Sequence, residues 1–108
     1  MSAKPLVSVV IPAYKATYFE AALASVCAQS YEHLEVVVCD DSRTGTIREC
    51  TARYQESCSF PIRYEFNESL RGELFNAIEC IKVASGKYIK FLHDDDGLHP
   101  ECLSLIHI

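Results

Sequence analysis

The stretch Leu34-Glu-Val-Val-Val-Cys39, followed at once by Asp40-Asp41-Ser42, is the clearest indicator of fold class in this chain. Three consecutive valines between further apolar residues are typical of a strand that is buried on both faces of a parallel sheet. Residues 6–11 (Leu-Val-Ser-Val-Val-Ile) have a similar composition and meet Pro12, which we expect to end the strand. The sequence therefore predicts two interior strands, each followed by polar or turn-forming residues.

Two segments with helical periodicity flank the strand predicted at residues 34–39, one before it and one after it. Residues 18–29 place their apolar side chains on one helical face: Phe19, Leu23, Val26 and Cys27. Residues 46–55 are more polar, and we expect Ile47 and Cys50 to face inward from a second helix. An exposed loop is expected at residues 57–61.

A third strand is predicted at residues 62–66 and a fourth at residues 88–92. Between them, apolar residues recur at helical spacing and predict an amphipathic helix that packs through them: Leu70, Leu74, Ala77, Ile78 and Ile81. We expect Gly86 in the C-cap region of this helix. Strands that alternate with helices predict an α/β fold of the nucleotide-binding type, with a mostly parallel sheet and flanking helices.

Length and composition limit the possible functions. The 108 residues suit one small domain or part of a larger one, and 49% apolar residues allow a hydrophobic core. The net charge of −5 argues against a protein that binds nucleic acid through a broad basic surface. No apolar run approaches the length of a membrane span, so we expect no transmembrane segment. Six cysteines without a CxxC pair predict reduced thiols in a cytoplasmic protein rather than a disulfide framework or a zinc site.

The acidic sequence His93-Asp94-Asp95-Asp96 directly follows the fourth predicted strand. Three adjacent carboxylates repel one another, and a divalent cation relieves that repulsion because Mg²⁺ and Mn²⁺ prefer hard oxygen ligands. Ligands of open α/β sheets bind at the carboxyl ends of the strands, where this cluster is expected. The alternative interpretation is an acidic surface turn, in which Asp is common.

Polar residues follow three of the predicted strands, and in a parallel sheet they would line one crevice: Pro12-Ala13-Tyr14, Asp40-Asp41-Ser42 and residues 93–96. Tyr14 could support a planar nucleobase while Asp40 or Asp41 accepts hydrogen bonds from the base or ribose. The alternatives are a half-buried packing ring for Tyr14 and a helix cap for Asp41 and Ser42. Because no glycine-rich phosphate-binding loop occurs, a diphosphate bound here would need a metal ion to bridge it.

Several motifs in a fixed order connect this chain to a known family. They extend from about Pro5 to Cys102 and are Val7-Ser-Val-Val-Ile-Pro-Ala-Tyr14, Ala22-Leu23-Ala-Ser25-Val26, Gln29-Ser-Tyr31, Glu35-Val-Val-Val-Cys-Asp-Asp-Ser42, Asn76, Gly86-Lys-Tyr-Ile, Phe91-Leu92 and Asp95-Asp96. In this order they resemble the opening of a family 2 glycosyltransferase with the GT-A fold. The resemblance implies that residues 1–102 are the Rossmann-like, nucleotide-sugar-binding part of such a domain.

The resemblance also implies a reaction and the residues that serve it. The reaction is transfer of a sugar, with inversion, from a UDP- or dTDP-linked donor to a hydroxyl of a glycan, a lipid-linked sugar or a protein. The positions implied for donor binding are Pro12, Ala13, Tyr14, Asp40, Asp41 and Asp94. The DXD motif of the family maps onto residues 93–95, which implies Asp95 as a ligand of Mg²⁺ or Mn²⁺ and Asp96 as a further metal contact. The general base is expected beyond Ile108.

The chain departs from the family pattern at several positions. His93 stands where the first Asp of the acidic motif is common. It is therefore open which of residues 93–96 bind the metal ion, and we expect His93 to be structural. Lys15 replaces a usual Asn, and Ser42-Arg43-Thr44-Gly45 replaces a usual glycine-serine-threonine sequence. Phe75 replaces a frequent Arg, so a basic contact to the donor would come from Arg71. The alternative for Arg71 is a solvated residue at a helix start.

Two other functional classes also place carboxylates at the edge of an α/β sheet. A nucleotidyltransferase commonly has a glycine-rich and basic loop after its first strand, which Pro12-Ala-Tyr-Lys15 does not provide. A receiver-like, Mg²⁺-binding signalling module would have its acidic pair after the first strand and a lone acceptor Asp after the third. The acidic residues of this chain follow the second and fourth strands instead.

The last residues, Leu103-Ser-Leu-Ile-His-Ile108, are identical to one reading frame of a transposon-end adapter used in sequencing libraries. We therefore expect a non-native tail at residues 103–108, the alternative being a short helix that begins at His99-Pro100-Glu101. A family 2 enzyme needs a second half for its acceptor and base, so we expect a truncated domain with weak donor binding and exposed apolar surface. The full-length protein is expected in the cytoplasm, either free or attached peripherally to a membrane.

Overall fold

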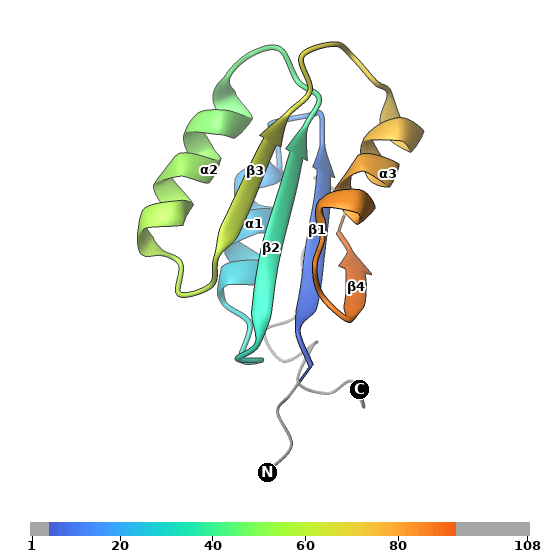
Figure 1. The fold of residues 1–108 in the computed structure, drawn as a ribbon. Helices are drawn as coiled ribbons and strands as arrows, with labels where there is room; N and C mark the ends of the chain where they lie inside the picture. The colour runs from blue at the N-terminus through green and yellow to red at the C-terminus, as the bar shows by residue number, and fades with distance from the viewer. Residues whose placement is uncertain (1–4, 93–108) are drawn as a thin grey trace.

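The computed structural model describes residues 5–92, in which strands and helices alternate along the chain (Figure 1). The strands are β1 (Val7–Ala13), β2 (Leu34–Asp40), β3 (Ile62–Phe66) and β4 (Tyr88–Phe91), and the helices are α1 (Phe19–Cys27), α2 (Thr46–Ser57) and α3 (Glu73–Val83). The sheet has the order β3-β2-β1-β4, and all its pairings are parallel. The predicted α/β fold is confirmed, and the carboxyl ends of the strands point toward one edge of the sheet, which we call the carboxyl edge.

Helices cover the two faces of the sheet unequally. Helices α1 and α2 pack on one face, while among residues 5–92 only α3 covers the other (Figure 1). The larger core, on the side of α1 and α2, includes Val9, Ile11, Val36, Val38, Phe19, Leu23, Val26, Ile47 and Cys50. The smaller core, under α3, consists of Val10, Val37, Cys39 and Cys80. The inward orientation predicted for Ile47 and Cys50 is confirmed, since both are buried.

Pro12 does not end the first strand, contrary to the sequence-based expectation, because β1 continues to Ala13. The Val10 carbonyl accepts from the N–H of Leu92, and the Ala13 carbonyl accepts from the N–H of Asp41, so alternate residues of β1 face β4 and β2. Pro12 shares the orientation of Val10 and faces the β4 side, where the register ends at the pair Val10–Phe91. Because the N–H that proline lacks would point toward β4, no hydrogen bond with β2 is lost. Only the pairing of β1 with β4 stops at this position.

The helix predicted through Leu70, Leu74, Ala77, Ile78 and Ile81 is present as α3, but its buried side is not the predicted one. Asn76 and Cys80 are the buried residues of α3, whereas Leu74 is 69% exposed and Ile78 is 39% exposed. Leu70 lies outside the helix and is also exposed. The prediction was wrong because α3 attaches to the sheet through a polar contact of Asn76 and the small Cys80 side chain, which periodicity of large apolar residues does not reveal.

Gly86 does not cap α3, since the C-cap residue is Ala84. Instead, Gly86 lies against β1: a Cβ atom added to it would be 2.5 Å from Ser8 Oγ and 2.9 Å from the Leu6 carbonyl oxygen. Its N–H donates to Ser8 Oγ at 2.8 Å. Glycine is required at this position because two segments of backbone approach each other there.

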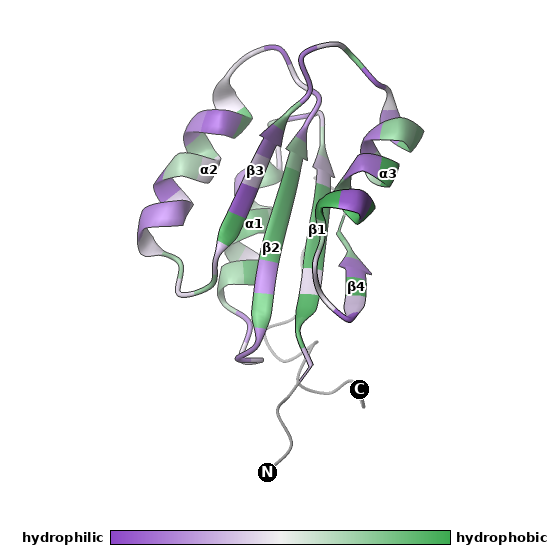
Figure 2. Ribbon diagram, viewed as in Figure 1, coloured by the Kyte–Doolittle hydropathy of each residue, from purple (hydrophilic) through white to green (hydrophobic). Residues whose placement is uncertain are grey.

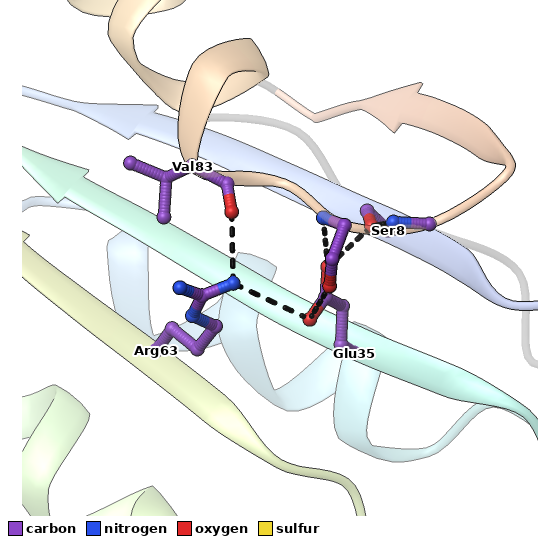
Figure 3. A network of polar contacts seen from close by, with 6 residues as sticks. Ser8, Glu35, Arg63 and Val83 are labelled. Atoms are coloured by element: carbon purple, nitrogen blue, oxygen red, sulfur yellow. Dashed lines mark hydrogen bonds and ion pairs between the residues drawn. The ribbon is translucent and has the colours of Figure 1, made fainter.

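A buried carboxylate fastens the turn between α3 and β4 to the sheet (Figure 3). Glu35, on β2, accepts hydrogen bonds from the Ser8 hydroxyl and from both the N–H and the hydroxyl of Ser85. Nη1 of Arg63 lies 3.9 Å from Glu35 Oε1 and also donates to the Val83 carbonyl at 2.8 Å. Burial alone would raise the pKa of Glu35, but these donors and the Arg63 charge hold the pKa below its usual value. The carboxylate therefore joins three strands to the segment that leads into β4.

Hydropathy follows the position of each strand in the sheet. Figure 2 shows β1 and β2 largely green, as suits interior strands, and β3 largely purple.

Of the helices between residues 5 and 92, none combines the length and apolar character needed to span a membrane. The exposed loop predicted at residues 57–61 is only partly confirmed: residues 58–61 join α2 to β3, but Ser57 is the last residue of α2, and Cys58 and Phe60 are half-buried against the core. The proposed tail at residues 103–108 lies outside the described residues.

Candidate functional site

The loops after β1 and β2 meet at the carboxyl edge, as the sequence predicted. Ala13 pairs in register with Asp40, and the N–H of Asp41 donates to the Ala13 carbonyl at 2.8 Å. Tyr14 and Ser42 are the next residues of the two loops. The third predicted segment, residues 93–96, lies outside the described residues; the strand before it, β4, pairs with β1 on the side opposite β2. The parallel register therefore brings two of the three predicted segments together.

Asp40 is 1% exposed, and its carboxylate is engaged within the protein. Oδ1 accepts from the backbone N–H of Ser42 at 2.8 Å and from the Ser42 hydroxyl at 2.6 Å, while Oδ2 accepts from the Tyr64 hydroxyl. Burial and this hydrogen bond raise the pKa of Tyr64 to about 12, so its hydroxyl stays protonated and keeps donating. Asp40 thus shapes the loop after β2 and ties it to β3.

Asp41 is 2% exposed and holds the loop between β3 and α3 against the carboxyl edge. Its carboxylate accepts from Nδ2 of Asn67 at 3.0 Å and from the backbone N–H groups of Arg71 and Gly72 at 2.9 Å each. Burial alone would raise the pKa of Asp41, but these donors and the charge of Arg43 lower it, so the group is ionised at neutral pH. Helix α2 begins at Thr46 with Gly45 as its N-cap residue and has no side-chain cap, so the alternative role of Asp41 and Ser42 as its cap is not observed.

The sequence analysis assigned no role to Asn67, which lies directly after β3. Its Nδ2 donates to Asp41 and also to Asn76 Oδ1 at 2.8 Å, and its carbonyl accepts from Arg43 Nη1 at 2.6 Å. Asn76 in turn donates to the Cys39 carbonyl at 2.9 Å. The rule that found the other loops, a polar residue directly after a strand, would also have identified Asn67.

The predicted donor-binding residues differ in what they present to solvent. Tyr14 is 57% exposed, which is more than a half-buried packing ring would be, and the side chain of Arg71 is 48% exposed. Arg71 precedes α3, and its Nη1 lies 4.0 Å from Glu79 Oε1. Ala13 is fully buried and its carbonyl accepts from the N–H of Asp41, so it presents no surface to a ligand and serves instead to hold the two loops together. Pro12 is partly buried beside it.

The carboxylates of Asp40 and Asp41 are almost fully buried, and internal hydrogen bonds use most of their capacity to accept. Each ionised carboxylate has about four lone-pair sites, and three internal donors occupy each group here. The carboxyl edge therefore combines an exposed aromatic ring and an exposed guanidinium group with two buried carboxylates, each of which keeps about one lone-pair site without an internal donor. This set suits a ligand with a planar ring, hydroxyl groups and negative charge.

Within residues 5–92, no cluster of three or more His, Cys, Asp or Glu side chains could hold a metal ion. The predicted metal ligands Asp95 and Asp96, with Asp94 beside them, lie outside the described residues. Their chemistry fits Mg²⁺ or Mn²⁺, because adjacent carboxylates supply hard oxygen ligands. The five cysteines of the described part are free thiols, and none belongs to a group of side chains there that could hold a metal ion: Cys27, Cys39, Cys50, Cys58 and Cys80.

Comparison with known proteins gives consistent matches. Residues 8–106 match the profile of the family described as "Glycosyl transferase family 2". The chain is 35% identical over 94 residues to the putative teichuronic acid biosynthesis glycosyltransferase TuaG of Bacillus subtilis, covering 86% of this chain and 37% of TuaG. It is 34% identical over 92 residues to the Escherichia coli UDP-Glc:alpha-D-GlcNAc-diphosphoundecaprenol beta-1,3-glucosyltransferase WfgD, covering 84% of this chain and 35% of WfgD. The chain thus spans about a third of the length of these curated relatives.

Solved structures with the same fold include two with bound nucleotides. S. aureus TarS 1–349 in complex with UDP superposes with a TM-score of 0.83 at 25% identity, over 92% of this chain and 30% of that one. The mannosyltransferase PcManGT from Pyrobaculum calidifontis, in complex with GDP-Man and Mn²⁺, superposes with a TM-score of 0.82 at 26% identity, over 96% of this chain and 31% of that one. The described residues therefore have the fold of the first part of such proteins.

Proposed function

Because the chain belongs to glycosyltransferase family 2 and has part of a GT-A fold, we propose that it is the donor-binding part of an inverting glycosyltransferase. The full protein would transfer a sugar from a UDP- or dTDP-linked donor to an acceptor hydroxyl. The observation that carries the proposal is the meeting of Tyr14, the Asp40-Asp41 pair and Arg71 at the carboxyl edge. Their combined chemistry matches the base, ribose and diphosphate of such a donor.

Each residue at this edge has a distinct proposed role. The exposed ring of Tyr14 stacks on the nucleobase, the partly buried Pro12 lines the same side, and the buried Ala13 positions Tyr14 through its pairing with Asp40. The remaining lone pairs of Asp40 and Asp41 accept hydrogen bonds from the base or ribose hydroxyls. The guanidinium group of Arg71 neutralises the diphosphate, a role that suits its planar fork of donors. Asp41 also fixes the backbone of Arg71, so the same carboxylate would support two parts of the donor site.

The acidic sequence after β4 completes the proposed site. Asp95 and Asp96 would hold Mg²⁺ or Mn²⁺, and Asp94 would lie toward the ribose. When bound, the ion supplies Lewis-acid stabilisation of the negative charge on the departing diphosphate. A separate carboxylate, beyond Ile108, would deprotonate the acceptor hydroxyl as general base.

The acceptor and the location of the full protein are proposed by analogy with the relatives. WfgD is named for a UDP-glucose donor and a diphosphoundecaprenol-linked acceptor. TuaG is named for teichuronic acid biosynthesis. We propose a glycan, a lipid-linked sugar or a protein as acceptor, and a cytoplasmic protein that attaches peripherally to the membrane when its acceptor is lipid-linked.

Titration calorimetry with UDP tests the donor site. We expect Mn²⁺ to tighten UDP binding by about tenfold over EDTA, equivalent to roughly 1.4 kcal/mol, in the intact chain and in Glu56→Ala. Glu56→Ala removes an exposed carboxylate from the last turn of α2 and serves as a matched control. In Asp95→Ala we expect the effect of Mn²⁺ to disappear. Equal Mn²⁺-assisted binding of UDP by the intact chain and Asp95→Ala would disprove the assigned ligand.

The same preparation distinguishes the competing classes. A receiver-like module would respond to acetyl phosphate with Mg²⁺, whereas a donor site for nucleotide sugars would not. A response to acetyl phosphate without any response to UDP would overturn the proposed function.

A further inference from the structure

Arg43 is a charged residue at the carboxyl edge that has no role in the donor site proposed for this chain. It lies in the loop after β2, within the sequence Ser42-Arg43-Thr44-Gly45 that departs from the usual family pattern. The residue is exposed, yet its Nη1 donates to the Asn67 carbonyl at 2.6 Å. Asn67 belongs to the loop between β3 and α3. Arg43 therefore joins two loops of the carboxyl edge, across 24 positions of sequence.

An aromatic ring holds the guanidinium group of Arg43 from another side. Its Cζ lies 5.1 Å from the centre of the Phe66 ring, and Cζ of Arg48 lies 4.8 Å from the same centre. The face of an aromatic ring attracts a cation, and a planar guanidinium group can stack on it while its N–H groups still donate in the plane. Phe66 is the last residue of β3, so this contact fixes Arg43 relative to the sheet.

Asn67 connects Arg43 to the carboxylate of Asp41. Its Nδ2 donates to Asp41 Oδ1 at 3.0 Å, and the same oxygen accepts from the N–H of Arg71 at 2.9 Å. The N–H of Gly72 donates to Oδ2 at 2.9 Å. Burial would raise the pKa of Asp41, but these three donors lower it, and the charge of Arg43 adds to that effect. One ionised carboxylate thus holds both ends of the loop between β3 and α3.

The middle of this loop has little packing of its own. Glu68, Ser69 and Leu70 are all exposed. Segments with few buried contacts open at low free energy, so the hydrogen bonds at the two ends determine the position of the loop. The side chain of Arg71 is carried by one of those ends. Its location therefore depends on Asp41 and on the groups that orient Asp41.

We propose that Arg43 is a positioning residue of the donor site. Acting through Asn67 and Asp41, it fixes the backbone that carries the Arg71 side chain. The inference rests on the proposed function, in which the guanidinium group of Arg71 neutralises the diphosphate of the donor. Arg43 then increases the affinity for a nucleoside diphosphate relative to the bare nucleoside, without contacting either ligand.

Hydrogen exchange tests this positioning in the absence of any ligand. In Arg43→Ala, we expect the backbone amides of Arg71 and Gly72 to exchange at least about threefold faster, because their carboxylate acceptor is held less firmly. The amide of Val37, in the interior strand β2, should be unaffected. The control Arg53→Ala removes an exposed guanidinium group near the end of α2 and should change none of these rates. Unchanged exchange in Arg43→Ala would overturn the proposal, as would equal acceleration at Val37.

Titration calorimetry with UDP and with uridine connects the positioning to the ligand. With Mn²⁺ present, Arg43→Ala should weaken UDP binding about three- to tenfold and uridine binding less than about twofold, because only UDP carries the charge that Arg71 meets. Arg43→Lys keeps the charge but not the planar fork, so its affinity for UDP should lie between those of Arg43→Ala and the intact chain. Equal weakening for the two ligands would mean a general loss of structure and would contradict the proposal.

A double-mutant cycle with Arg71 separates an indirect role from a direct one. Once Arg71→Ala has removed the guanidinium group, adding Arg43→Ala should weaken UDP binding by less than about a further twofold. Fully additive losses would show that Arg43 meets the diphosphate itself, against the proposal. If the intact chain binds no UDP, the proposed donor site is refuted, whereas faster exchange at Arg71 and Gly72 in Arg43→Ala would still support the positioning of this loop.

Discussion

Gly86 illustrates how a single residue serves a contact between distant segments. Its amide donates to Ser8 Oγ across 78 positions of sequence, and a Cβ at this position would lie 2.8 Å from the Ser8 backbone nitrogen. Backbone atoms of an interior strand cannot move aside as the end of a flexible side chain can. The glycine is therefore needed for its small size rather than for its conformational freedom.

We predict that Gly86→Ala lowers the free energy of unfolding by about 1–3 kcal/mol, the usual cost of forcing an extra methyl group into a packed site. Urea denaturation followed by circular dichroism measures the change. The control is Gly45→Asn: Gly45 has φ +79° and open space around its Cβ position, and Asn tolerates this left-handed conformation. Equal stability of Gly86→Ala and the intact chain would contradict the close approach.

Helix α3 shows that an amphipathic pattern does not identify which side of a helix packs on its own sheet. Asn76, 2% exposed, donates to the Cys39 carbonyl and accepts from Asn67, so a polar side chain anchors the helix to β2. The larger apolar residue Ile78 makes no comparable contribution to the described core. The stability of α3 on the sheet should therefore depend on the asparagine more than on the isoleucine.

We predict that Asn76→Ala destabilises the chain by about 1–3 kcal/mol, because it removes two buried hydrogen bonds, one to the Cys39 carbonyl and one from the Asn67 amide group. Ile78→Ala should change the stability of the 108-residue chain by no more than about 0.5 kcal/mol, as is usual for a surface position. Chemical denaturation of the two variants side by side measures both values. A larger loss for Ile78→Ala would mean that α3 packs through its apolar side after all.

Glu35 and Asp41 couple several elements and make the stability of the whole molecule depend on pH. Glu35 lies near the amino ends of the strands and joins β1, β2 and β3 to the turn before β4. Asp41 lies at the carboxyl edge and joins β2 to the loop before α3. Both groups have lowered pKa values in the folded state, so both stabilise the fold only while they are ionised.

We predict that the free energy of unfolding is nearly constant between about pH 7 and 5.5 and falls as the pH decreases through and below about 4, since unfolded Glu and Asp titrate near 4.3 and 3.9. At pH 7, Glu35→Gln should lower stability by about 1.5–3 kcal/mol, the range for hydrogen bonds to a charged group. The difference from the intact chain should narrow as the pH falls, because the intact carboxylate becomes protonated. Urea titrations at a series of pH values measure this, with the exposed Glu56→Gln as control. A constant difference at all pH values would contradict the role of the charge.

Local composition was enough to predict the order of strands and helices and the α/β class. Runs such as residues 34–39 combine β-branched residues with a clear polar end, and these signals lie within a few residues of each other. The same signals located Tyr14 and the Asp40-Asp41 pair at the ends of neighbouring strands. These features were predictable because parallel pairing follows from strands that alternate with helices.

Three features could be read only from the folded chain: the side of α3 that packs on the sheet, the crowding at Gly86, and the carboxylate of Asp41 that fixes the backbone of Arg71 across 30 positions of sequence. Each depends on the register and separation of segments that no local pattern relates. A periodic apolar face predicts that one side of a helix will be covered, but it does not predict which part of the molecule covers it. The physical reason is that burial and hydrogen bonding are properties of pairs of surfaces, and one of each pair lies far away along the sequence.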